Sequence, residues 1–459
     1  MRKVLIANRG EIAVRIIRAC HDLGLETVAV YSQSDNEALH VLHAGEAICI
    51  GEPASNKSYL KIPHILSACE VTGADAIHPG YGFLSENANF ASICESCGVQ
   101  FIGPIPETIR LLGDKAKAKQ TAREANCPVI PGSEGVVQTV EEGKKIAEEF
   151  GYPVFIKASA GGGGRGIRLV EKESDFERLF LAARAEAEIC FGNPDVYLEK
   201  MIENPRHIEV QIMADTHGHY IHLGERDCTV QRRRQKLIEE TPSPVLSPEI
   251  RAAIGDAAVR IVKQAGYSSV GTVEFLLDKN KKFYFMEVNT RVQVEHTVTE
   301  ELTGVDIVAE QIRIAQGEHL DLKQEDVRFD GHVIQFRINA EDPQKDFMPS
   351  PGRLEYYVAP GGPHVRVDSA CYAGYTISPN YDSMIAKLIV KGRDRKEAIQ
   401  RSIRALEEFH IGGVKTTIPF HRDMLQHPTF HSCDFDLAFV DELLASGYAF
   451  GHSSIDEQV

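Results

Sequence analysis

The sequence lacks the features that mark several common classes of protein. None of its 459 residues is tryptophan, no segment is repeated or of low complexity, and no apolar run approaches the length needed to span a membrane. The opening segment, MRKVLIANRGEIAVRI, has only a short apolar run before charged residues, so it predicts a first strand and not a secretory signal. Positive charge is in deficit, since 66 acidic residues face 50 basic ones and the formal net charge is −16. A surface of that charge repels phosphate, which argues against nucleic acid or an anionic membrane as the main partner.

The ten cysteines form no cluster with metal-binding spacing. The closest pair, Cys94 and Cys97, lies in SICESCGV, which has no second Cys-x-x-Cys and no flanking histidine. We therefore interpret the cysteines as reduced, mostly buried thiols and not as a zinc or redox site. Such thiols indicate a reducing compartment, and we expect a cytoplasmic protein.

What the sequence does contain is the composition of a globular protein, with 43% hydrophobic and 25% charged residues. Its length predicts two or three domains. Over the first hundred residues, apolar strand runs alternate with helical segments, which favours βαβ units and a parallel sheet. The segment NRGEI after the first strand lacks a Gly-x-Gly-x-x-Gly turn, which excludes a nicotinamide dinucleotide site there. A second region opens near Asp114 with a polar helix, and a third begins near residue 330.

Polar and apolar residues alternate strictly in FYFMEVNTRVQVEH, residues 283–296. A strand would place on one face the side chains of Glu287, Asn289, Arg291, Gln293 and Glu295. Alternation by itself is typical of an edge strand with one wet face.

The preceding segment, GTVEFLLDKNKK, changes that interpretation because it predicts a hairpin with the polar turn KNKK. Whether the loop has two residues or four, Glu274 then faces Glu287 across the two strands. Two like charges so close are destabilising unless the pKa of one carboxyl rises or a cation lies between them. With Asn289 further along the same face, these hard oxygen ligands suit Mg²⁺ or Mn²⁺, and we expect a metal site.

The glycine-rich segment KASAGGGGRGIRLV also bears on ligand binding. Gly161, Gly163 and Gly166 match Gly-x-Gly-x-x-Gly, but the residues that follow alternate like a strand, and no Gly-Lys-Ser/Thr is present. What remains is a strand, a mobile glycine loop and a second strand, with Lys157 just before the loop. Bare glycines let backbone N–H groups approach phosphate oxygens, and a lysine adds charge. A flexible surface linker explains the same glycines equally well.

Other polar segments have ordinary interpretations. A solvated charged face is the default for the basic run Arg232, Arg233, Arg234 and Lys236. Residues of a hairpin turn, and not metal ligands, are the simpler interpretation of His217, His219 and His222. One strand face is shared by His207, Glu209 and Gln211.

Taken together, these segments resemble the ATP-grasp superfamily and, specifically, biotin carboxylase. The resemblance covers nearly the whole chain and includes IANRGEIAVRIIRAC, HPGYGFLSEN, KASAGGGGRGIR, YLEKMIENPRHIEVQ, ERDCTVQRRRQK, VNTRVQVEHTVTE, RINAEDP and YDSMIAKL. It implies an α/β protein with a Rossmann-like N-terminal domain at 1–113 and an ATP-grasp central domain at 114–329, whose glycine-loop lid spans about 130–203. A mixed α+β C-terminal domain at 330–446 and a tail at 447–459 would follow.

The resemblance also implies roles on the nucleotide side of a site. The metal ligands would be Glu274, Glu287 and Asn289. Phosphates would be bound by Lys115, Lys157, Gly163 and Gly164. The adenine and ribose pocket would be lined by Glu199, Lys200, Met201, Ile202, His207, Gln231 and Arg234.

For the chemistry, the resemblance implies a catalytic set of Lys236, Arg291, Glu295 and Arg337. Bicarbonate would be held by Lys236, Arg291, Gln293 and the backbone of Val294. Glu295 would be the base that removes the bicarbonate proton. Arg337 would stabilise the enolate-like ureido oxygen of biotin, and Tyr81 would border the biotin pocket.

Three positions differ from the family pattern. Arg234 stands where histidine is frequent, Ala160 replaces a glycine, and Thr297 stands where many acetyl-CoA carboxylase relatives have proline. The chain also has no Met-Lys-Met carrier motif, so we expect a separate biotin carboxyl carrier protein as substrate and separate carboxyltransferase subunits. The family further implies a homodimer formed through the first and third domains.

We therefore expect the ATP-dependent biotin carboxylase of an acetyl-CoA carboxylase, acting in fatty acid synthesis. The same component of a pyruvate or other acyl-CoA carboxylase is the alternative. Another ATP-grasp ligase that phosphorylates a different carboxylate is also open, as is a catalytically silent protein that only binds nucleotide. Such a silent protein should have lost its base or metal ligands, yet the sequence retains Glu274, Glu287, Arg291 and Glu295.

Overall fold

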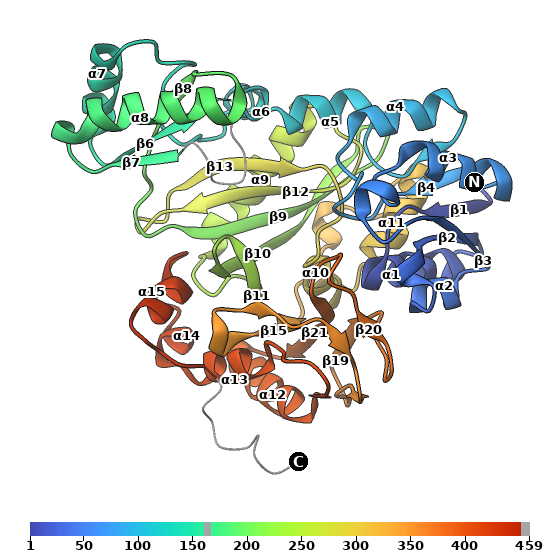
Figure 1. Cartoon of the computed structure of the whole chain (residues 1–459). Coiled ribbons are helices and arrows are strands. Elements are labelled where there is room, and N and C mark those ends of the chain that lie inside the picture. The colour runs from blue at the N-terminus through green and yellow to red at the C-terminus, as the bar shows by residue number, and fades with distance from the viewer. Residues whose placement is uncertain (160–166, 451–459) are drawn as a thin grey trace.

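The computed structural model describes residues 1–159 and 167–450. The glycines of the predicted phosphate loop therefore lie outside the described residues, including Gly163 and Gly164, as does most of the predicted tail. Figure 1 shows an N-terminal part in blue, a central part in green and yellow, and a C-terminal part in orange and red.

A five-stranded parallel sheet of order β3-β2-β1-β4-β5 forms the N-terminal part. Its strands are β1 (Lys3–Ile6), β2 (Glu26–Ser32), β3 (Glu46–Gly51), β4 (Ala76–His78) and β5 (Gln100–Phe101). The helices beside it are α1 (Gly10–Asp22), α2 (Leu39–His43), α3 (Ile62–Thr72), α4 (Ala88–Ser96) and α5 (Pro106–Gly113). Val4 and Ile6 pack in one core cluster with α1, whereas Leu5 packs in another with α3 and α4. Both faces of the sheet are thus covered, which explains its unbroken apolar runs and confirms the predicted parallel sheet.

One eight-stranded antiparallel sheet runs through the central and C-terminal parts, in the order β13-β12-β9-β10-β11-β14-β21-β19. Its strands are β9 (Arg206–Ala214), β10 (Tyr220–Arg232), β11 (Gln235–Thr241), β12 (Ser269–Leu277), β13 (Phe283–Asn289), β14 (His332–Asn339), β19 (Val365–Ser369) and β21 (Met384–Gly392). The pairing of β11 with β14 joins the two parts edge to edge. Side chains at that junction are therefore fixed by a continuous hydrogen-bonded ladder.

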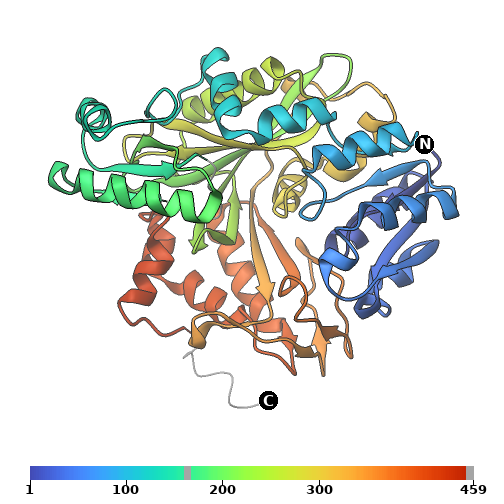
Figure 2. The same ribbon diagram turned by 45° about the horizontal axis from the view of Figure 1, so that its top comes forward.

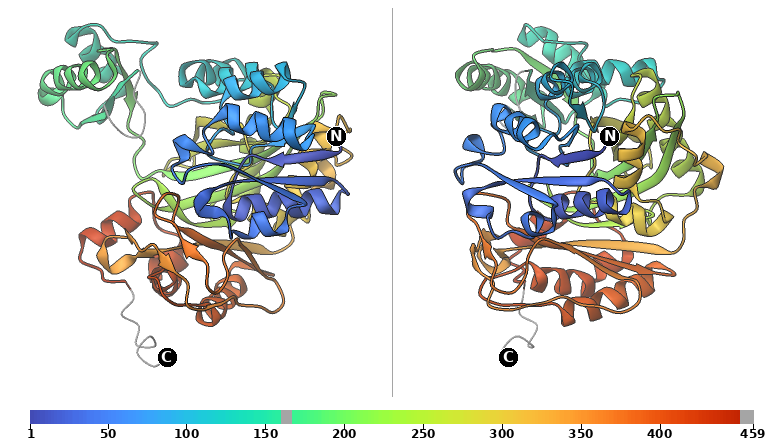
Figure 3. Two further views of the ribbon diagram at one scale, coloured as in Figure 1. Left: turned by 45° about the vertical axis from the view of Figure 1, so that its right-hand side comes forward. Right: turned by 90° about the vertical axis from the view of Figure 1, so that its right-hand side faces the viewer.

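A smaller antiparallel sheet, β7-β6-β8, forms a separate unit with its own apolar core. It consists of α7 (Val140–Phe150), β6 (Val154–Ala158), β7 (Ile167–Val170), α8 (Glu173–Phe191) and β8 (Val196–Lys200). We call it the lid unit; Figures 2 and 3 show that it projects from the rest of the molecule. Lys157 of β6 pairs with Ile167 of β7, which confirms the predicted strands on either side of the glycine segment.

The remaining elements are helices and short strands of the central and C-terminal parts. They are α6 (Lys115–Glu124), α9 (Pro248–Gln264), α10 (His296–Thr303), α11 (Ile307–Ala315), α12 (Arg395–Glu408), α13 (Ile418–Gln426), α14 (Pro428–Ser432), α15 (Phe439–Ala445) and the short strands β15 (Glu341–Asp342), β16 (Met348–Pro349), β17 (Gly352–Arg353), β18 (Tyr357–Val358), β20 (Thr376–Ile377) and β22 (His410–Ile411). The predicted polar helix is α6, and the side chain of Asp114 caps it by accepting from the N–H groups of Ala116 and Lys117.

Within 1–159 and 167–450, no helix has the length and apolar character that crossing a membrane requires. All ten cysteines are free thiols and six of them are buried, as predicted.

Candidate active site

The hairpin of β12 and β13 places Glu274 directly opposite Glu287, as the sequence predicts. The route to that pairing differs from the prediction. The strands separate after the pair Leu277–Phe283, which leaves a five-residue loop, and a bulge beyond Phe285 shifts the register before Glu287. Because the bulge compensates for the odd loop length, the two carboxyl groups still meet on one face.

The prediction of a strand through Glu295 is wrong. β13 ends at Asn289, and residues 290–295 form a loop before α10 begins at His296. We call this segment the 290–295 loop. Its Val292 is fully buried in the core cluster that contains α1, and the backbone N–H of Thr290 donates to Glu86 at 3.0 Å. In residues 290–295 the alternation therefore reflects a loop packed between the N-terminal part and the large sheet, whereas residues 283–289 form β13, the edge strand of that sheet.

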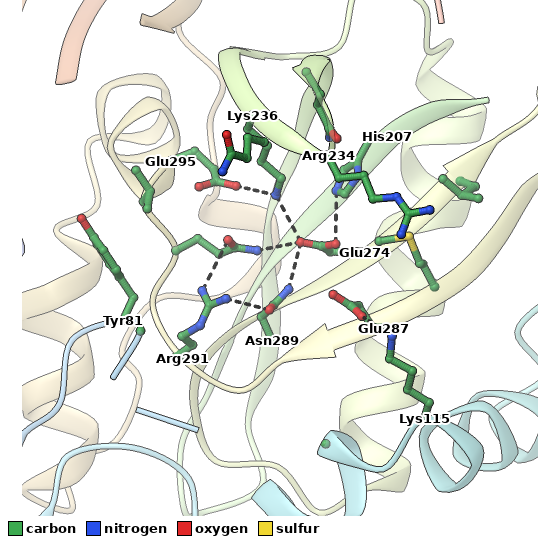
Figure 4. A pocket seen from close by; sticks show the side chains of 18 of the residues that line it. Tyr81, Lys115, His207, Arg234, Lys236, Glu274, Glu287, Asn289, Arg291 and Glu295 are labelled. Atoms are coloured by element: carbon green, nitrogen blue, oxygen red, sulfur yellow. Dashed lines mark hydrogen bonds and ion pairs between the residues drawn. The ribbon is translucent and has the colours of Figure 1, made fainter. Parts of the chain in front are cut away.

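Glu274 lies at the centre of the polar cluster in Figure 4. Its Oε1 accepts hydrogen bonds from Asn289 at 2.9 Å and Gln293 at 3.0 Å. The same oxygen accepts from Lys236 at 3.1 Å, and Oε2 lies 3.3 Å from His207 Nε2. Burial raises the pKa of a carboxyl, but here Lys236 and His207 outweigh it and the pKa of Glu274 is well below its usual range. Glu274 is therefore a carboxylate at neutral pH.

Glu287 has a different environment although it faces the same space. Its one ion pair in the described part of the chain is with Lys115, at 3.9 Å. Burial, followed by the charge of Glu274, raises the pKa of Glu287. The carboxyl groups of Glu274 and Glu287 therefore repel each other when both are ionised, and one distant lysine does not balance the charge of Glu287. A divalent cation between the two groups would relieve that repulsion.

Lys236 is enclosed by carboxylates and is not part of a solvated face. Its Nζ donates to Glu209 and Glu295 at 2.6 Å each, and to Glu274 at the distance given above. Burial lowers the pKa of a lysine, but these carboxylates raise the pKa of Lys236 well above its usual value. The default interpretation of the basic run holds only for Arg233 and Arg234, an exposed two-residue turn between β10 and β11.

Glu295 is fully buried between two cations, Lys236 and Arg337. Arg337 Nη2 donates to Glu295 Oε2 at 3.0 Å, while its Nε donates to Glu239 at 2.6 Å. Burial raises the pKa of Glu295, but Lys236, Arg337 and Arg226 together outweigh it and the net direction is downward. Glu295 is therefore a carboxylate at neutral pH, placed to accept a proton.

The cluster opens into a cavity of about 1810 Å³ between the three parts of the molecule. Single-ligand sites are typically about 300–1,000 Å³, so this cavity has room for more than one substrate. It is lined by Tyr81, Lys115, Lys157, Glu199, His207, Gln231, Arg234, Lys236, Glu274, Glu287, Asn289, Arg291, Gln293, Val294, Glu295 and Arg337. The cavity thus brings together every predicted site residue in the described part of the chain except three.

The three exceptions follow β8 or end it: Lys200, Met201 and Ile202. The Lys200 amine points away from the cavity and donates to the carbonyls of Gly151 at 2.7 Å and Tyr152 at 3.2 Å. The side chain of Lys200 is thus a support for the lid unit, and its backbone N–H donates to the carbonyl of Pro131 at 2.8 Å.

Several residues that line the cavity, or that hold the side chains lining it, were missed in the sequence. Lys119 of α6 forms an ion pair with Glu199, which Lys157 also contacts. Glu86 accepts from Arg291 Nε at 3.0 Å and fixes that side chain. No local pattern marks Glu86, because its partner lies 205 residues away. For Glu209 a signal existed, since it shares a strand face with His207 and Gln211.

Paired carboxylates on a hairpin, with lysines of α6 and of the lid unit lining the same cavity, are the arrangement of an ATP-grasp ligase. Residues 114–323 match the family model described as the ATP binding domain of the carbamoyl-phosphate synthase L chain. Residues 1–109 and 335–442 match the models for the biotin carboxylase N-terminal and C-terminal domains.

Similar curated proteins include several biotin carboxylases. Biotin carboxylase of Nostoc sp. is 58% identical over 96% of this chain and 99% of its own, and biotin carboxylase 1 of Bacillus subtilis is 57% identical over 96% and 98%. A pyruvate carboxylase component of Methanothermobacter thermautotrophicus is 52% identical over 96% of this chain and 89% of its own.

Solved structures agree with these relatives. The chain is similar to biotin carboxylase from Campylobacter jejuni in complex with β,γ-ATP, with a TM-score of 0.91 and 48% identity over 96% of this chain and 98% of that one. It is also similar to the biotin carboxylase domain dimer of Hydrogenobacter thermophilus 2-oxoglutarate carboxylase, in complex with MgADP, ADP and bicarbonate, with a TM-score of 0.89 and 50% identity over 96% and 98%. The chain therefore belongs to the biotin carboxylase family and is an ATP-dependent ligase.

Proposed function

We propose that this chain carboxylates biotin on a separate carrier protein, using ATP and bicarbonate, as the first half-reaction of an acetyl-CoA carboxylase. The observation that carries the proposal is the buried carboxylate Glu295, held between Lys236 and Arg337 in the cavity that also contains Glu274 and Glu287. A base, an oxyanion-binding arginine and metal-binding carboxylates in one cavity are the groups this chemistry needs.

The first step begins with bicarbonate, a poor nucleophile, beside Lys236 and Arg291. As a bicarbonate oxygen attacks the γ-phosphate of ATP, Glu295 accepts the bicarbonate proton. The products of this step are ADP and carboxyphosphate. Lys236 is cationic over the whole neutral range, so it can hold the anion before and after proton transfer.

The carboxylate oxygens of the cavity fit a hard divalent cation, because Glu274 and Glu287 face each other. The amide of Asn289 lies beside them, and its Nδ2 donates to Glu274 Oε1 at 2.9 Å. These three residues would hold Mg²⁺ or Mn²⁺, which would screen the charge of the transferring phosphoryl group. Lys115 and Lys157 line the same cavity from α6 and from the lid unit, and they would bind phosphate oxygens.

The second step concerns biotin. Carboxyphosphate breaks down to CO₂ and phosphate, phosphate removes the N1′ proton of biotin, and CO₂ adds to that nitrogen. Arg337 would stabilise the negative charge that develops on the ureido oxygen. Tyr81, whose hydroxyl donates to the carboxylate of Glu11, lies on the far side of the cavity from Lys115 and would border biotin (Figure 4).

Acetyl-CoA carboxylase is proposed as the parent complex because several of the similar proteins are named biotin carboxylase, including plastid ones. The similarity to a pyruvate carboxylase component supports pyruvate as the alternative acceptor. A homodimer, a cytoplasmic location and separate carrier and carboxyltransferase subunits belong to the same proposal. Complexes isolated from the native cells should carboxylate acetyl-CoA; a complex active only on pyruvate would select the alternative.

The half-reaction itself is tested by ADP formation with Mg²⁺, with bicarbonate and free biotin added or omitted. We expect the rate to depend on bicarbonate and to rise with biotin. A rate that ignores both additions would refute the proposed function. Sedimentation equilibrium should show dimers, and monomer alone at micromolar concentration would contradict the homodimer.

A further inference from the structure

Lys387 is a lysine with no solvent exposure, and it lies where the three parts of the molecule meet. It belongs to β21 of the C-terminal part. Its Nζ is 2.9 Å from Glu11 Oε2 on α1 of the N-terminal part. The same Nζ donates to the backbone carbonyl of Val294 in the 290–295 loop at 3.1 Å. One ammonium group thus joins the N-terminal part, the large sheet and the loop that carries Glu295.

The position of Lys387 in the sheet relates it to Arg337. The two residues are directly opposite each other on β21 and β14, so their side chains stand on one face of the sheet. Arg337 reaches the carboxylate of Glu295, and Lys387 reaches the carbonyl of the residue before it. Two neighbouring strands therefore hold two successive residues of the loop.

The contact to Val294 constrains Glu295 through the backbone. The Val294 carbonyl belongs to the planar peptide that joins these two residues, so fixing its direction fixes where the Glu295 side chain begins. The carbonyl of Gln293 is held in the same manner, by Nδ1 of the buried His296 at 2.6 Å. Both carbonyls are thereby turned onto buried donors, while the side chains of Gln293 and Glu295 face the cavity.

A purely structural role does not explain an ion pair at this place. Taking two charges out of water is costly, and apolar residues of similar size often give equal or better stability. Asp368 on β19 lies 4.0 Å from Lys387 but is already paired with Arg366 at 2.8 Å. Among the described residues, the one backbone carbonyl that accepts from Lys387 Nζ belongs to the peptide of the proposed base.

We propose that Lys387, with Glu11 as its counter-ion, is a positioning residue for the bicarbonate step. It holds the Val294–Glu295 peptide so that the loop backbone and the base meet bicarbonate in the productive geometry. This inference rests on the proposed function. Because Glu11 also accepts from Tyr81, the same pair connects the loop to the biotin side of the cavity.

The test uses Lys387→Met, which removes the ammonium and retains much of the side-chain volume. A displaced base and binding loop should raise the KM for bicarbonate or lower kcat by about tenfold to a hundredfold. The affinity for MgADP should stay at the wild-type value, because Lys387 contacts no residue of the nucleotide side. Glu11→Gln keeps the Lys387 contact to Val294 and should give a smaller change in the same parameters.

The matched control is Arg395→Met. Arg395 forms a largely buried ion pair with Glu240 at 2.7 Å, but it does not line the cavity or contact the 290–295 loop. This variant should lower the melting temperature without changing the KM for bicarbonate.

Wild-type KM and kcat in Lys387→Met would overturn the inference. So would an equal loss of bicarbonate and MgADP binding, which would indicate general damage to the fold. If Lys387→Met does not fold, Glu11→Gln provides the test. A changed KM for bicarbonate or kcat with unchanged MgADP affinity supports the inference, and wild-type values of all three overturn it. If the wild-type enzyme shows no bicarbonate-dependent ADP formation, both the proposed function and this inference are wrong. If the wild type shows that activity and Lys387→Met has the same kinetic constants, only the inference is wrong.

Discussion

Replacing Glu295 with glutamine removes the proposed base and keeps its shape. In the wild type, Glu295 is a buried carboxylate whose pKa is lowered, since Lys236, Arg337 and Arg226 together outweigh the effect of burial. It can therefore accept the bicarbonate proton at neutral pH. The neutral amide of glutamine cannot accept that proton, although its single carbonyl oxygen can still accept a hydrogen bond from Lys236 or from Arg337.

The substitution should lower both kcat and stability, and the contacts of Glu295 indicate by how much. Loss of a general base lowers kcat by about 10²- to 10⁴-fold. That corresponds to about 3–5 kcal/mol in the activation free energy. Stability should fall by less than the about 3–5 kcal/mol that follows when a buried charge is left alone. Lys236 keeps Glu209 at 2.6 Å, and Arg337 keeps Glu239 at 2.6 Å. One negative charge less in the cavity should leave nucleotide affinity unchanged or improve it.

The assay compares kcat for bicarbonate-dependent ADP formation with the affinity for MgADP. Glu239→Gln is the matched control, because Glu239 is equally buried and binds the same Arg337 but does not line the cavity. The control should keep ATP cleavage within severalfold of wild type. A Glu295→Gln enzyme that retains more than about a tenth of the wild-type kcat, against the loss of about a hundredfold or more expected for a base, would refute the reasoning. Loss of MgADP binding would mean that Glu295 belongs to the nucleotide site.

Three further predictions concern charges around the cavity. Arg337→Ala should reduce biotin carboxylation more than bicarbonate-dependent ATP cleavage, and an equal loss of both would move Arg337 out of the biotin step. His207 should titrate near pH 9 in NMR spectra, because the charge of Glu274 and hydrogen bonds to Glu209 and Glu274 together outweigh the burial that lowers its pKa. MgADP should shift this titration downward, and no shift would place the metal away from Glu274. Glu240 has its pKa lowered to about 2, since His332 and Arg395 outweigh burial, so it contributes stability above its ordinary pKa that is lost as pH falls toward 2. Glu240→Gln should therefore lower the free energy of unfolding by about 3 kcal/mol near neutral pH and change it little near pH 2, as urea unfolding would measure.

Local sequence patterns were sufficient to predict the N-terminal parallel sheet and the pairing of Glu274 with Glu287. The runs KVLIAN and ETVAVYS predicted a parallel sheet because a strand covered on both faces must be apolar throughout. The pairing of Glu274 with Glu287 followed from strand periodicity and a short polar turn. Periodicity could not show the five-residue loop and the bulge, because their effects on register cancel at that pair.

The rest of the site depends on contacts between distant segments. The alternation in 290–295 was interpreted as strand, yet Val292 is buried against the N-terminal part and Thr290 is held by Glu86. Lys236 was placed by default on a solvated face because its carboxylate partners lie 27 to 59 residues away along the chain. Neither the joining of β11 to β14 nor the burial of Lys387 has a local signal, since both arise from the assembly of the three parts.

The proposed mechanism requires above all that Glu274 and Glu287 hold a metal–nucleotide in the same cavity as Glu295. A crystal structure of the protein with MnADP and bicarbonate tests it directly through the anomalous signal of Mn²⁺. We predict a manganese peak between Glu274 and Glu287, with bicarbonate in contact with Lys236 and Arg291 and within hydrogen-bond reach of Glu295. A manganese peak elsewhere, or bicarbonate beyond the reach of Glu295, would contradict the account.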